Sequence, residues 1–545
     1  MKTTKHTDYL IIGAGPAGLQ LAYLLQKAGS NYIVLEAAST PGSFFEKFPR
    51  HRTLISINKT RTGFPPGEEV CLRYDWNSLI SDEQAEMSFG RYTQKYFPNA
   101  DYYVRYLQDF AEHYSLNISY NTRVDTVSKD DLFYVRDTNG KTWTSPCLIV
   151  ATGTHLPYIP NVPGIELAEH YTEFTLDEDY YKDKRVLILG KGNSAFEMAD
   201  YLTETAQTIH ICSPQSVEFA WKTHYIANLR AINTNFIDTY VLKQQNSILD
   251  ADIDLIERDG DEYLVHLTFT HAGGQRGILA YDRVLSCTGF RFDDSIFDDS
   301  SRPEMVIRNK LPAMTSEWES TNVKNLFFAG AIMQMRDFHK TNSNVVHGFR
   351  NNVKVLSGML ISRFEGQPLP CEKLPIDSQV LTDHIIERVS VSAALFLQPG
   401  FLCDVLVIND MASEAQYYEG LPIDFVHDSF LGKHSHYYVI TLEYGEIEGD
   451  LFRVERDPDP QNSFSDAYIH PIIRRYSGSV TLCEHHIPDN LENDWRLNNH
   501  PGATPMMRHW EYMGEKDPHA FKQIFTRDLK MFLDMDIISR MDMNN

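Results

Sequence analysis

The chain has 545 residues, which is too long for one compact core and predicts two or three domains. Its hydrophobic content of 42%, with 12% aromatic residues, is enough for packed interiors and excludes a wholly disordered chain. The formal net charge of −24 argues against nucleic acid or an anionic lipid surface as a partner, because both require clustered positive charge.

Two features of the sequence bear on its compartment. No apolar run approaches the roughly 20 residues that span a bilayer, and no signal-peptide pattern precedes the first apolar run. The seven cysteines lie far apart and form no C-x-x-C pair, as is usual in a reducing compartment. We therefore expect a cytoplasmic protein that has no membrane partner and no redox-active dithiol of its own.

The first predicted elements, over residues 8–36, are a strand, a glycine turn, a helix and a second strand. Residues 9–12 are a continuous apolar run, as in a strand buried on both faces of a parallel sheet. Residues 19–27 have helical character, and residues 32–35 form the returning strand. This order of elements is typical of a dinucleotide-binding domain.

The turn in this unit has the spacing G-x-G-x-x-G, with Gly13, Gly15 and Gly18. The first glycine permits a tight turn, the second lets the backbone approach a pyrophosphate, and the third allows the helix to pack closely on the strand. The pyrophosphate would rest on the helix N-terminus, where free N–H groups stabilise it. Glu36 ends the next strand and is placed to accept hydrogen bonds from ribose hydroxyls, so we predict a dinucleotide site here.

The same unit recurs later, with predicted strands over residues 185–189 and 208–212 around a helix over residues 195–203. Its turn reads Gly190-Lys-Gly192-Asn193-Ser194-Ala195, with alanine in place of the third glycine. Alanine is still small enough for close packing, and Ser194 can donate a hydrogen bond to a phosphate. We therefore predict a second dinucleotide site.

The end of the second strand bears on the choice of coenzyme. It runs to Ser213 without an acidic residue, whose carboxylate would bind the 2′-hydroxyl of NADH and repel a 2′-phosphate. This ending favours NADPH over NADH. Lys222 and His224 are the nearest candidates for contact with the phosphate.

The order of the apolar strands indicates one domain split around another. The first dinucleotide-binding domain is predicted over residues 1–155 and 300–375, and the second over residues 156–299. Residues 376–545 hold short β-rich runs among polar loops and predict a separate domain. The expected fold class is α/β: two Rossmann-like domains, one inserted in the other, followed by a C-terminal β-rich α+β domain.

These features resemble the FAD/NAD(P)H flavoproteins, the family that includes glutathione reductase and flavin-containing monooxygenases. Longer stretches are similar to the class B flavin-containing monooxygenases and to the FAD-dependent oxidoreductase domain-containing proteins of the endoplasmic reticulum. The resemblance extends through the C-terminal domain, and the stretches that carry it include residues 41–45, 56–59, 190–197, 221–240 and 335–350.

Two departures from the family pattern stand out. The monooxygenase fingerprint survives only as His170-x-x-x-Phe174, and the lack of a final tryptophan weakens a Baeyer–Villiger assignment. Many relatives have Gly-Asp after the late strand, where the aspartate holds the ribityl chain of FAD. This chain has Gly330-Ala331, so another group must hold that part of the cofactor.

The resemblance implies FAD in the first domain and NADPH in the second. The residues expected to bind FAD are Gly13, Gly15, Gly18, Glu36, Phe44, Arg52, Val124, Ala151, Thr152, Gly153, Gly330 and His339. The residues expected to bind the coenzyme are Gly190, Gly192, Asn193, Ser194, Ser213 and Lys222. The expected catalytic residues are Asn58, Lys59 and His224.

Several of these side chains have a simpler interpretation beside the functional one. Asn58 lies where the resemblance places an amide near the reactive flavin carbon, but a loop asparagine also caps turns. Lys59 and Arg52, together with Arg50, would clamp an anionic substrate, or would only contact FAD phosphate or solvent.

Other candidate side chains are aromatic or histidine. Trp76, Trp221 and His224 would form a wall over the nicotinamide or the substrate, with core packing as the alternative. His339, Lys340 and His347 flank the late glycine-rich helix start and would touch the flavin, or would only be satisfied histidines of that helix start.

Histidines of the C-terminal domain match no zinc spacing, so we predict no metal site. The domain is expected to cover the active site or to mediate self-association as a homodimer. The histidines concerned are His434, His436, His485, His486 and His509.

The resemblance implies an NADPH-dependent flavin monooxygenase that transfers one oxygen atom from a hydroperoxyflavin to a small nucleophile. N-hydroxylation of an amine or amino acid is the expected reaction, with molecular oxygen as the second substrate. One alternative is a reductase or oxidase that passes electrons to a protein or thiol partner. Another is a redox-sensing binding module that does not turn over NADPH.

Overall fold

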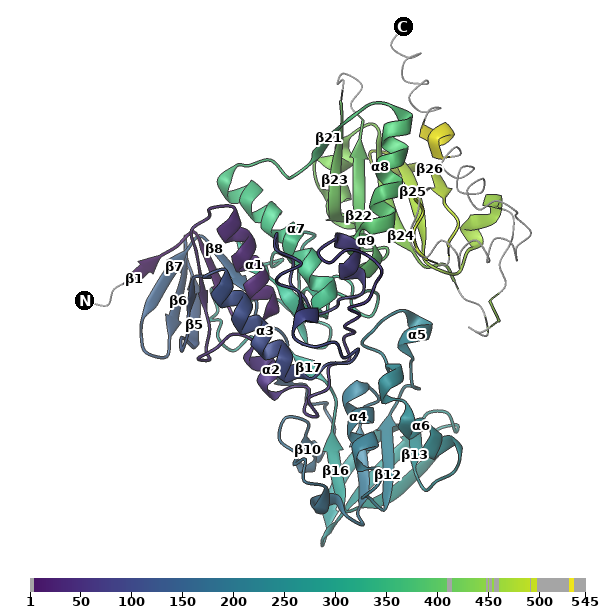
Figure 1. The fold of residues 1–545 in the computed structure, drawn as a ribbon. Helices are drawn as coiled ribbons and strands as arrows, with labels where there is room; N and C mark the ends of the chain where they lie inside the picture. Colours follow the sequence, from purple (N-terminus) through teal and green to yellow (C-terminus); the bar gives the residue numbers. More distant parts are fainter. Residues whose placement is uncertain are drawn as a thin grey trace.

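The computed structural model of the protein describes residues 4–408, 414–446, 449, 453–454, 460–490, 492–496 and 529–533. These residues form three bodies, each built around a sheet (Figure 1). The first and third bodies share α7 (Val346–Glu365), which lies between them in Figure 1. The predicted fold class is confirmed.

The first body contains a parallel sheet whose strands are almost wholly buried. Its order is β20 (Leu326–Phe328), β8 (Cys147–Val150), β2 (Tyr9–Ile12), β3 (Tyr32–Leu35) and β4 (Ile118–Ser119). A second sheet has the order β1 (Thr4–His6), β7 (Thr142–Ser145), β6 (Phe133–Asp137) and β5 (Val124–Lys129). The helices are α1 (Pro16–Lys27), α2 (Ser43–Lys47), α3 (Ala100–His113) and α7.

The second body is inserted between β8 and β20 of the first. Its sheet has the order β10 (Glu169–His170), β16 (Arg283–Ser286), β11 (Arg185–Leu189), β12 (Thr208–Ser213), β13 (Ser247–Asp259), β14 (Glu262–Phe269) and β15 (Arg276–Tyr281). The strands from β10 to β13 are parallel, and β13, β14 and β15 are antiparallel. The helices are α4 (Asn193–Leu202), α5 (Ala220–Thr223) and α6 (Asn235–Val241).

Two short strands join the first body to the second. They are β9 (Leu156–Pro157) and β17 (Phe290–Arg291), which pair antiparallel where the chain leaves and re-enters the first body. A hairpin of β18 (Met305–Val306) and β19 (Leu311–Pro312) follows. Short 3-10 helices lie at Glu69–Arg73, Phe89–Arg91, Ile165–Leu167, Glu178–Tyr181, Ala231–Asn233, Gly330–Met335, Leu431–Lys433 and Pro460–Ser465.

The third body is an antiparallel sheet with α8 (Ser378–Val391) packed on one face. The order is β21 (Glu372–Pro375), β23 (Glu414–Pro422), β22 (Leu402–Val407), β24 (Tyr437–Glu443), β25 (His470–Ser477) and β26 (Val480–His486). The other helices are α9 (Ala393–Leu397) and α10 (Ile423–Asp428). Because β21 pairs with β23, the predicted boundary at residue 375 falls one strand too late for this sheet.

Strand β22 joins the third body to the first, because its side chains point alternately into the cores on its two faces. Cys403, Val405 and Val407 belong to the core of the first body, whereas Leu406 packs with α8 on the opposite face. Successive side chains of a strand point to opposite faces, so a single strand is buried on both sides. Asp404 therefore faces α8 and is completely buried.

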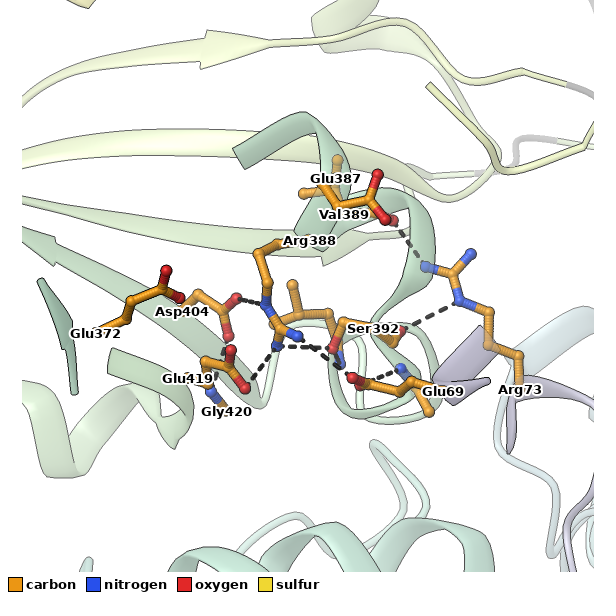
Figure 2. A network of polar contacts seen from close by, with 12 residues as sticks. Glu69, Arg73, Glu372, Glu387, Arg388, Val389, Ser392, Asp404, Glu419 and Gly420 are labelled. Carbon is orange, nitrogen blue, oxygen red and sulfur yellow. Dashed lines mark hydrogen bonds and ion pairs between the residues drawn. The ribbon is translucent and has the colours of Figure 1, made fainter. Parts of the chain in front are cut away.

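A network of charges crosses the contact between these two bodies (Figure 2). Arg388 of α8 donates from Nε to Asp404 Oδ2 at 2.8 Å, and its Nη1 lies 3.4 Å from Glu69 Oε2 of the first body. Arg73, which is 1% exposed, donates to the carbonyl oxygens of Val389, Ser392 and Asn493 at 2.7, 3.2 and 3.0 Å. The third body is thus fastened to the first by buried polar contacts as well as by apolar packing.

Candidate active site

The first glycine turn lies at the carboxyl end of β2 and opens α1. Gly13 has a φ of 103°, and a Cβ there would lie 2.8 Å from the carbonyl oxygen of Ala151. A Cβ on Gly18 would lie 1.9 Å from the Gly13 oxygen, whereas one on Gly15 would meet nothing within 4 Å. The space beside Gly15 and the uncapped N-terminus of α1 together fit a pyrophosphate.

The predicted ribose ligand lies against this turn. Glu36 is 6% exposed, and its carboxylate accepts hydrogen bonds from the backbone N–H groups of Ala14 at 2.7 Å and Ala38 at 2.9 Å. The N–H of Thr122 donates to the Glu36 carbonyl at 2.8 Å, which brings the start of β5 at Val124 to the same edge. Glu36 and Val124 thus lie together at the carboxyl end of β3.

Residues 151–153 and Gly330, which are expected to bind FAD, lie against the first glycine turn. The N–H of Ala151 donates to the Ile12 carbonyl at 2.8 Å, and a Cβ on Gly330 would lie 2.8 Å from the Ala17 Cβ. Within the described part of the chain, the Thr152 hydroxyl is buried and has no hydrogen-bond partner. These residues form a cradle along one sheet edge that fits FAD.

Sequence reasoning missed Asp337, which follows the 3-10 helix Gly330–Met335. Its Oδ2 accepts hydrogen bonds from the Thr341 hydroxyl and from the Ser343 N–H at 3.1 Å. Its Oδ1 is buried without a partner among the described residues. Burial raises the pKa of Asp337 against the lowering effect of these hydrogen bonds. This carboxyl is a candidate for the work that the missing Gly-Asp aspartate does in relatives.

The second glycine turn repeats the geometry of the first. Gly190 has a φ of 107°, and a Cβ there would lie 2.4 Å from the carbonyl oxygen of Cys287. Gly192 precedes α4, and a Cβ on it would meet nothing within 4 Å. Ala195 is fully buried in the third position, and Ser194 is half-buried in the first turn of the helix.

Asn193 is expected to bind the coenzyme, but its side chain hydrogen-bonds to other residues of the second body. Its Nδ2 donates to the carbonyl oxygens of Ala227 and Asn228, both at 3.0 Å. Its Oδ1 accepts from the Arg230 N–H at 3.0 Å and from Asn233 Nδ2 at 3.1 Å. Because all its hydrogen-bonding groups are engaged, this amide ties the start of α4 to residues 227–233, and only its backbone N–H can face a phosphate.

The carboxylate of Asp250 lies beside Ser213, although the two residues are distant in the sequence. Asp250 of β13 pairs in register with Ser213, and Lys191 forms an ion pair with its carboxylate. His271 Nδ1 lies 2.8 Å from the second oxygen of Asp250. Burial acts to raise the pKa of Asp250, but hydrogen bonds, chiefly from Lys191, outweigh it and lower the pKa. Lys222, the predicted phosphate contact, is solvent-exposed on α5.

Residues 224–230 join all three bodies through stacked rings. His224 stacks on Tyr444 of the third body, with ring centroids 3.7 Å apart and planes at 9°. Tyr225 stacks on His339 of the first body at 5.1 Å. We call this meeting point of the three bodies the junction, and we define it by these four residues together with Arg230, Trp76, His347 and Asn58.

The remaining junction residues come mainly from the first body. The Arg230 guanidinium lies 5.1 Å from the centre of the Trp76 ring, and Trp76 stacks on His347 at 4.1 Å. Asn58 is 2% exposed and donates from Nδ2 to the carbonyl oxygen of Thr93 at 2.8 Å. The backbone N–H of Trp76 donates to the carbonyl of Ile57, the neighbour of Asn58, at 3.1 Å.

Several polar atoms of the junction are buried without a protein partner. As far as the described residues go, these atoms are Asn58 Oδ1, His224 Nε2 and both ring nitrogens of His347. Burial lowers the pKa of His224 and of His347 and so favours the neutral form of both imidazoles. Neutral rings and an open amide oxygen suit contacts to a flavin, a nicotinamide or a polar substrate.

The other predicted side chains lie outside the junction or are already engaged. Lys59 is solvent-exposed, as are Lys340 and Trp221, which stacks on Phe219. Arg52 donates to Asp101 Oδ1 at 2.6 Å, and Phe44 is 38% exposed against Phe48 and Phe290. Arg50 donates to the carbonyl oxygens of Tyr171, Thr172 and Phe174, so it fastens two bodies and spends three of its five N–H donors on the backbone.

The seven cysteines are all free thiols, and His509 lies outside the described residues. Among the residues with assigned positions, no group of three or more His, Cys, Asp or Glu side chains is arranged to hold a metal ion. No helix in the described ranges is long and apolar enough to cross a bilayer.

This arrangement is that of a flavoprotein oxidoreductase with two dinucleotide-binding domains. Residues 10–330 match the pyridine nucleotide-disulphide oxidoreductases, and the chain belongs to this family. The cofactor prediction, FAD together with NADP(H), is confirmed at the level of the family, as is the prediction of an oxidoreductase.

The chain is also similar to individual curated proteins and to solved structures. FAD-dependent oxidoreductase domain-containing protein 2 of Mus musculus is 34% identical over 92% of this chain and 79% of its own length. Senecionine N-oxygenase of Tyria jacobaeae is 24% identical over 59% of this chain and 66% of its own. The flavin-containing monooxygenase of Stenotrophomonas maltophilia superposes with a TM-score of 0.49 at 18% identity, over 66% of this chain and 99% of its own.

Proposed function

We propose that the protein is an NADPH-dependent flavin monooxygenase that hydroxylates the nitrogen of a small amine or amino acid. The observation that carries this proposal is the junction, where aromatic rings from three bodies stack in pairs and buried polar atoms have no hydrogen-bond partner among the described residues. Oxygen transfer requires a site from which water is excluded, because water access releases hydrogen peroxide instead of product. Bound FAD supplies hydride acceptance from NADPH and activation of oxygen.

The residues of the chain would divide the work as follows. The N-termini of α1 and α4 hold the two pyrophosphates with backbone N–H groups. The Oδ1 of Asn58, which has no hydrogen-bond partner among the described residues, would accept a hydrogen bond from the substrate amine. The stack of His224 on Tyr444 closes the site on the side of the third body.

The preference for NADPH is supported by the surroundings of Ser213. The nearby carboxylate of Asp250 is paired with Lys191 and contacts His271, so little negative charge remains to repel a 2′-phosphate. A cytoplasmic location and a homodimer stay predictions.

The alternative function is delivery of electrons from FAD to a protein partner. It is favoured by the Mus musculus relative, whose similarity covers 92% of the chain and so includes the third body, whereas the N-oxygenase similarity covers 59%. The seven free cysteines lie apart, so such an enzyme would have to use thiols of its partner.

One experiment separates the two functions. The FAD-loaded protein is mixed with NADPH, ¹⁸O₂ and a panel of amines and amino acids, and products are examined by mass spectrometry. The monooxygenase proposal expects an N-hydroxylated product that contains one ¹⁸O atom. Peroxide equal to the NADPH consumed with every compound, together with anaerobic reduction of a protein disulphide, would favour the alternative. No reduction of the flavin by NADPH would contradict both.

A further inference from the structure

Arg230 is a half-buried cation at the junction that has no carboxylate partner among the residues that the structure describes. Its Nη1 donates to the carbonyl oxygen of Ile55 at 3.0 Å, and its guanidinium lies over the ring of Trp76. Burial lowers its pKa, and the only opposing influence comes from Tyr96. Since the chain has 74 acidic and 50 basic residues, a half-buried arginine that has no carboxylate partner in the described part of the chain requires an explanation.

Two arginines of the first body, Arg50 and Arg350, donate to backbone carbonyls. Arg50 makes three hydrogen bonds to carbonyl oxygens, and Arg350 makes two, to Ser78 and Leu72. Those side chains are structural ties. In the described part of the molecule, Arg230 uses one of its three guanidinium nitrogens, so its Nε and Nη2 remain open to a ligand.

Two contacts fix the place of this open edge. The Arg230 N–H is held by Asn193 Oδ1, which anchors its backbone beside the start of α4. The guanidinium reaches Ile55, three residues before Asn58, and shares the Trp76 ring with His347. The open edge therefore lies where the FAD-binding body meets the coenzyme-binding body.

We propose that Arg230 anchors a carboxylate of the substrate, so that the substrate is an amino acid or another carboxylate-bearing amine. A guanidinium presents two parallel N–H donors that match the two oxygens of a carboxylate. The coenzyme pyrophosphate already has the N-terminus of α4, which leaves this cation for the substrate. The claim that the bound carboxylate belongs to a substrate rests on the proposed function. The claim that Arg230 binds a carboxylate does not.

The test measures binding to the FAD-loaded full chain in the presence of NADP⁺. Calorimetric titrations compare amino acids with the amines that lack only the carboxylate: L-lysine with cadaverine, L-ornithine with putrescine, and L-phenylalanine with phenethylamine. An amino acid of the panel should bind and its amine should not. Arg230→Gln should weaken the binding of that amino acid by about 30-fold, since a charge-assisted bidentate contact is lost. The affinity of Arg230→Lys should lie between those of the wild type and Arg230→Gln.

Arg258 provides a matched control, because it also has one carbonyl contact and one aromatic ring but lies exposed on β13. Arg258→Gln should change nothing, and NADP⁺ affinity should be equal in all variants. Equal binding of amine and amino acid, no binding of any amino acid, or a loss of NADP⁺ affinity in Arg230→Gln would overturn the inference. Selective amino acid binding that depends on Arg230, without ¹⁸O in any product, would uphold the anchor and contradict the proposed function alone.

Discussion

Neighbouring glycines of the first turn meet different constraints. Gly18 is required by the fold itself, because a Cβ there would collide with the Gly13 carbonyl at 1.9 Å. Gly15 faces open space, so its lack of a side chain matters only when a phosphate approaches the backbone. Stability and cofactor binding can therefore be separated within one turn.

Alanine substitutions test this separation. Gly18→Ala should destabilise the FAD-free protein by about 1–3 kcal/mol, because the helix must move away from β2. Gly15→Ala should leave the unfolding temperature of the FAD-free protein unchanged. It should weaken the binding of FAD by at least about 10-fold, because the methyl group takes the phosphate position. Thermal unfolding and FAD fluorescence titration measure the two effects. Equal behaviour of the two variants would refute the distinction.

Glu197 is a second residue whose environment leads to a measurement. It lies half-buried on α4, and burial raises its pKa from 4.5 to about 7, against a hydrogen bond with Tyr171 that lowers it. The folded state thus binds the proton more tightly than the unfolded state. The stability that this proton contributes is complete below about pH 4.5 and is lost as the pH rises through about 7.

Glu197→Gln should remove this dependence, because glutamine resembles the protonated acid at every pH. The difference in unfolding free energy between the variant and the wild type should therefore shift in favour of the variant, by on the order of 1–2 kcal/mol, as the pH rises from 5 to 8. Urea denaturation at four pH values measures the difference, with the exposed Glu204→Gln as control. A constant difference across that range would show that the acid is ionised throughout.

At the scale of elements, the parallel register of β12 and β13 sets the charge around the coenzyme. Ser213 and Asp250 end up side by side, although 36 residues separate them in the chain. Asp250→Asn should free Lys191 and raise the ratio of kcat/KM for NADPH to that for NADH by about 10-fold. Steady-state kinetics with both coenzymes measure the ratio, and the exposed Asp252→Asn on the same strand should leave it unchanged. A fall in the ratio would mean that Asp250 favours NADPH in some other way.

The elements also show what the sequence can predict. Apolar runs predict β2, β3 and β11 to the residue, because buried parallel strands need continuous hydrophobic side chains. The two-residue strands β9 and β17 have no such pattern, since pairing between distant segments creates them.

Site residues divide in the same way. The glycine turns are predictable, because backbone geometry permits little else at Gly13 and Gly190. The roles of Asp250, Asp337 and Arg230 depend on neighbours that only the folded chain supplies, and the engagement of Asn193 depends on the loop at residues 227–233.

At the scale of the whole molecule, Arg73 is the main polar tie between the first and third bodies. Its contacts with the carbonyl oxygens of Val389 and Ser392 are buried (Figure 2), and a third, with Asn493, is partly buried. Arg73→Gln should destabilise this contact by about 2–4 kcal/mol, because buried carbonyls lose their donors. Calorimetry should then resolve an early transition of the third body that the wild type lacks. The exposed Arg105→Gln on α3 serves as control, and a single unshifted transition in Arg73→Gln would contradict this role.

The stack of His224 on Tyr444 changes how the molecule can move. The second body is joined to the first by the pairing of β9 with β17, by Arg50 and by the stack of Tyr225 on His339. The third body is fixed to the first through Arg73 and touches the second through Tyr444, so the three bodies form a closed mechanical loop. In such a ring of contacts, one body can rotate against its neighbour only if a contact elsewhere in the ring breaks. Movement of the second body away from the third therefore requires breaking a stack between two rings that lie about 220 residues apart in the chain.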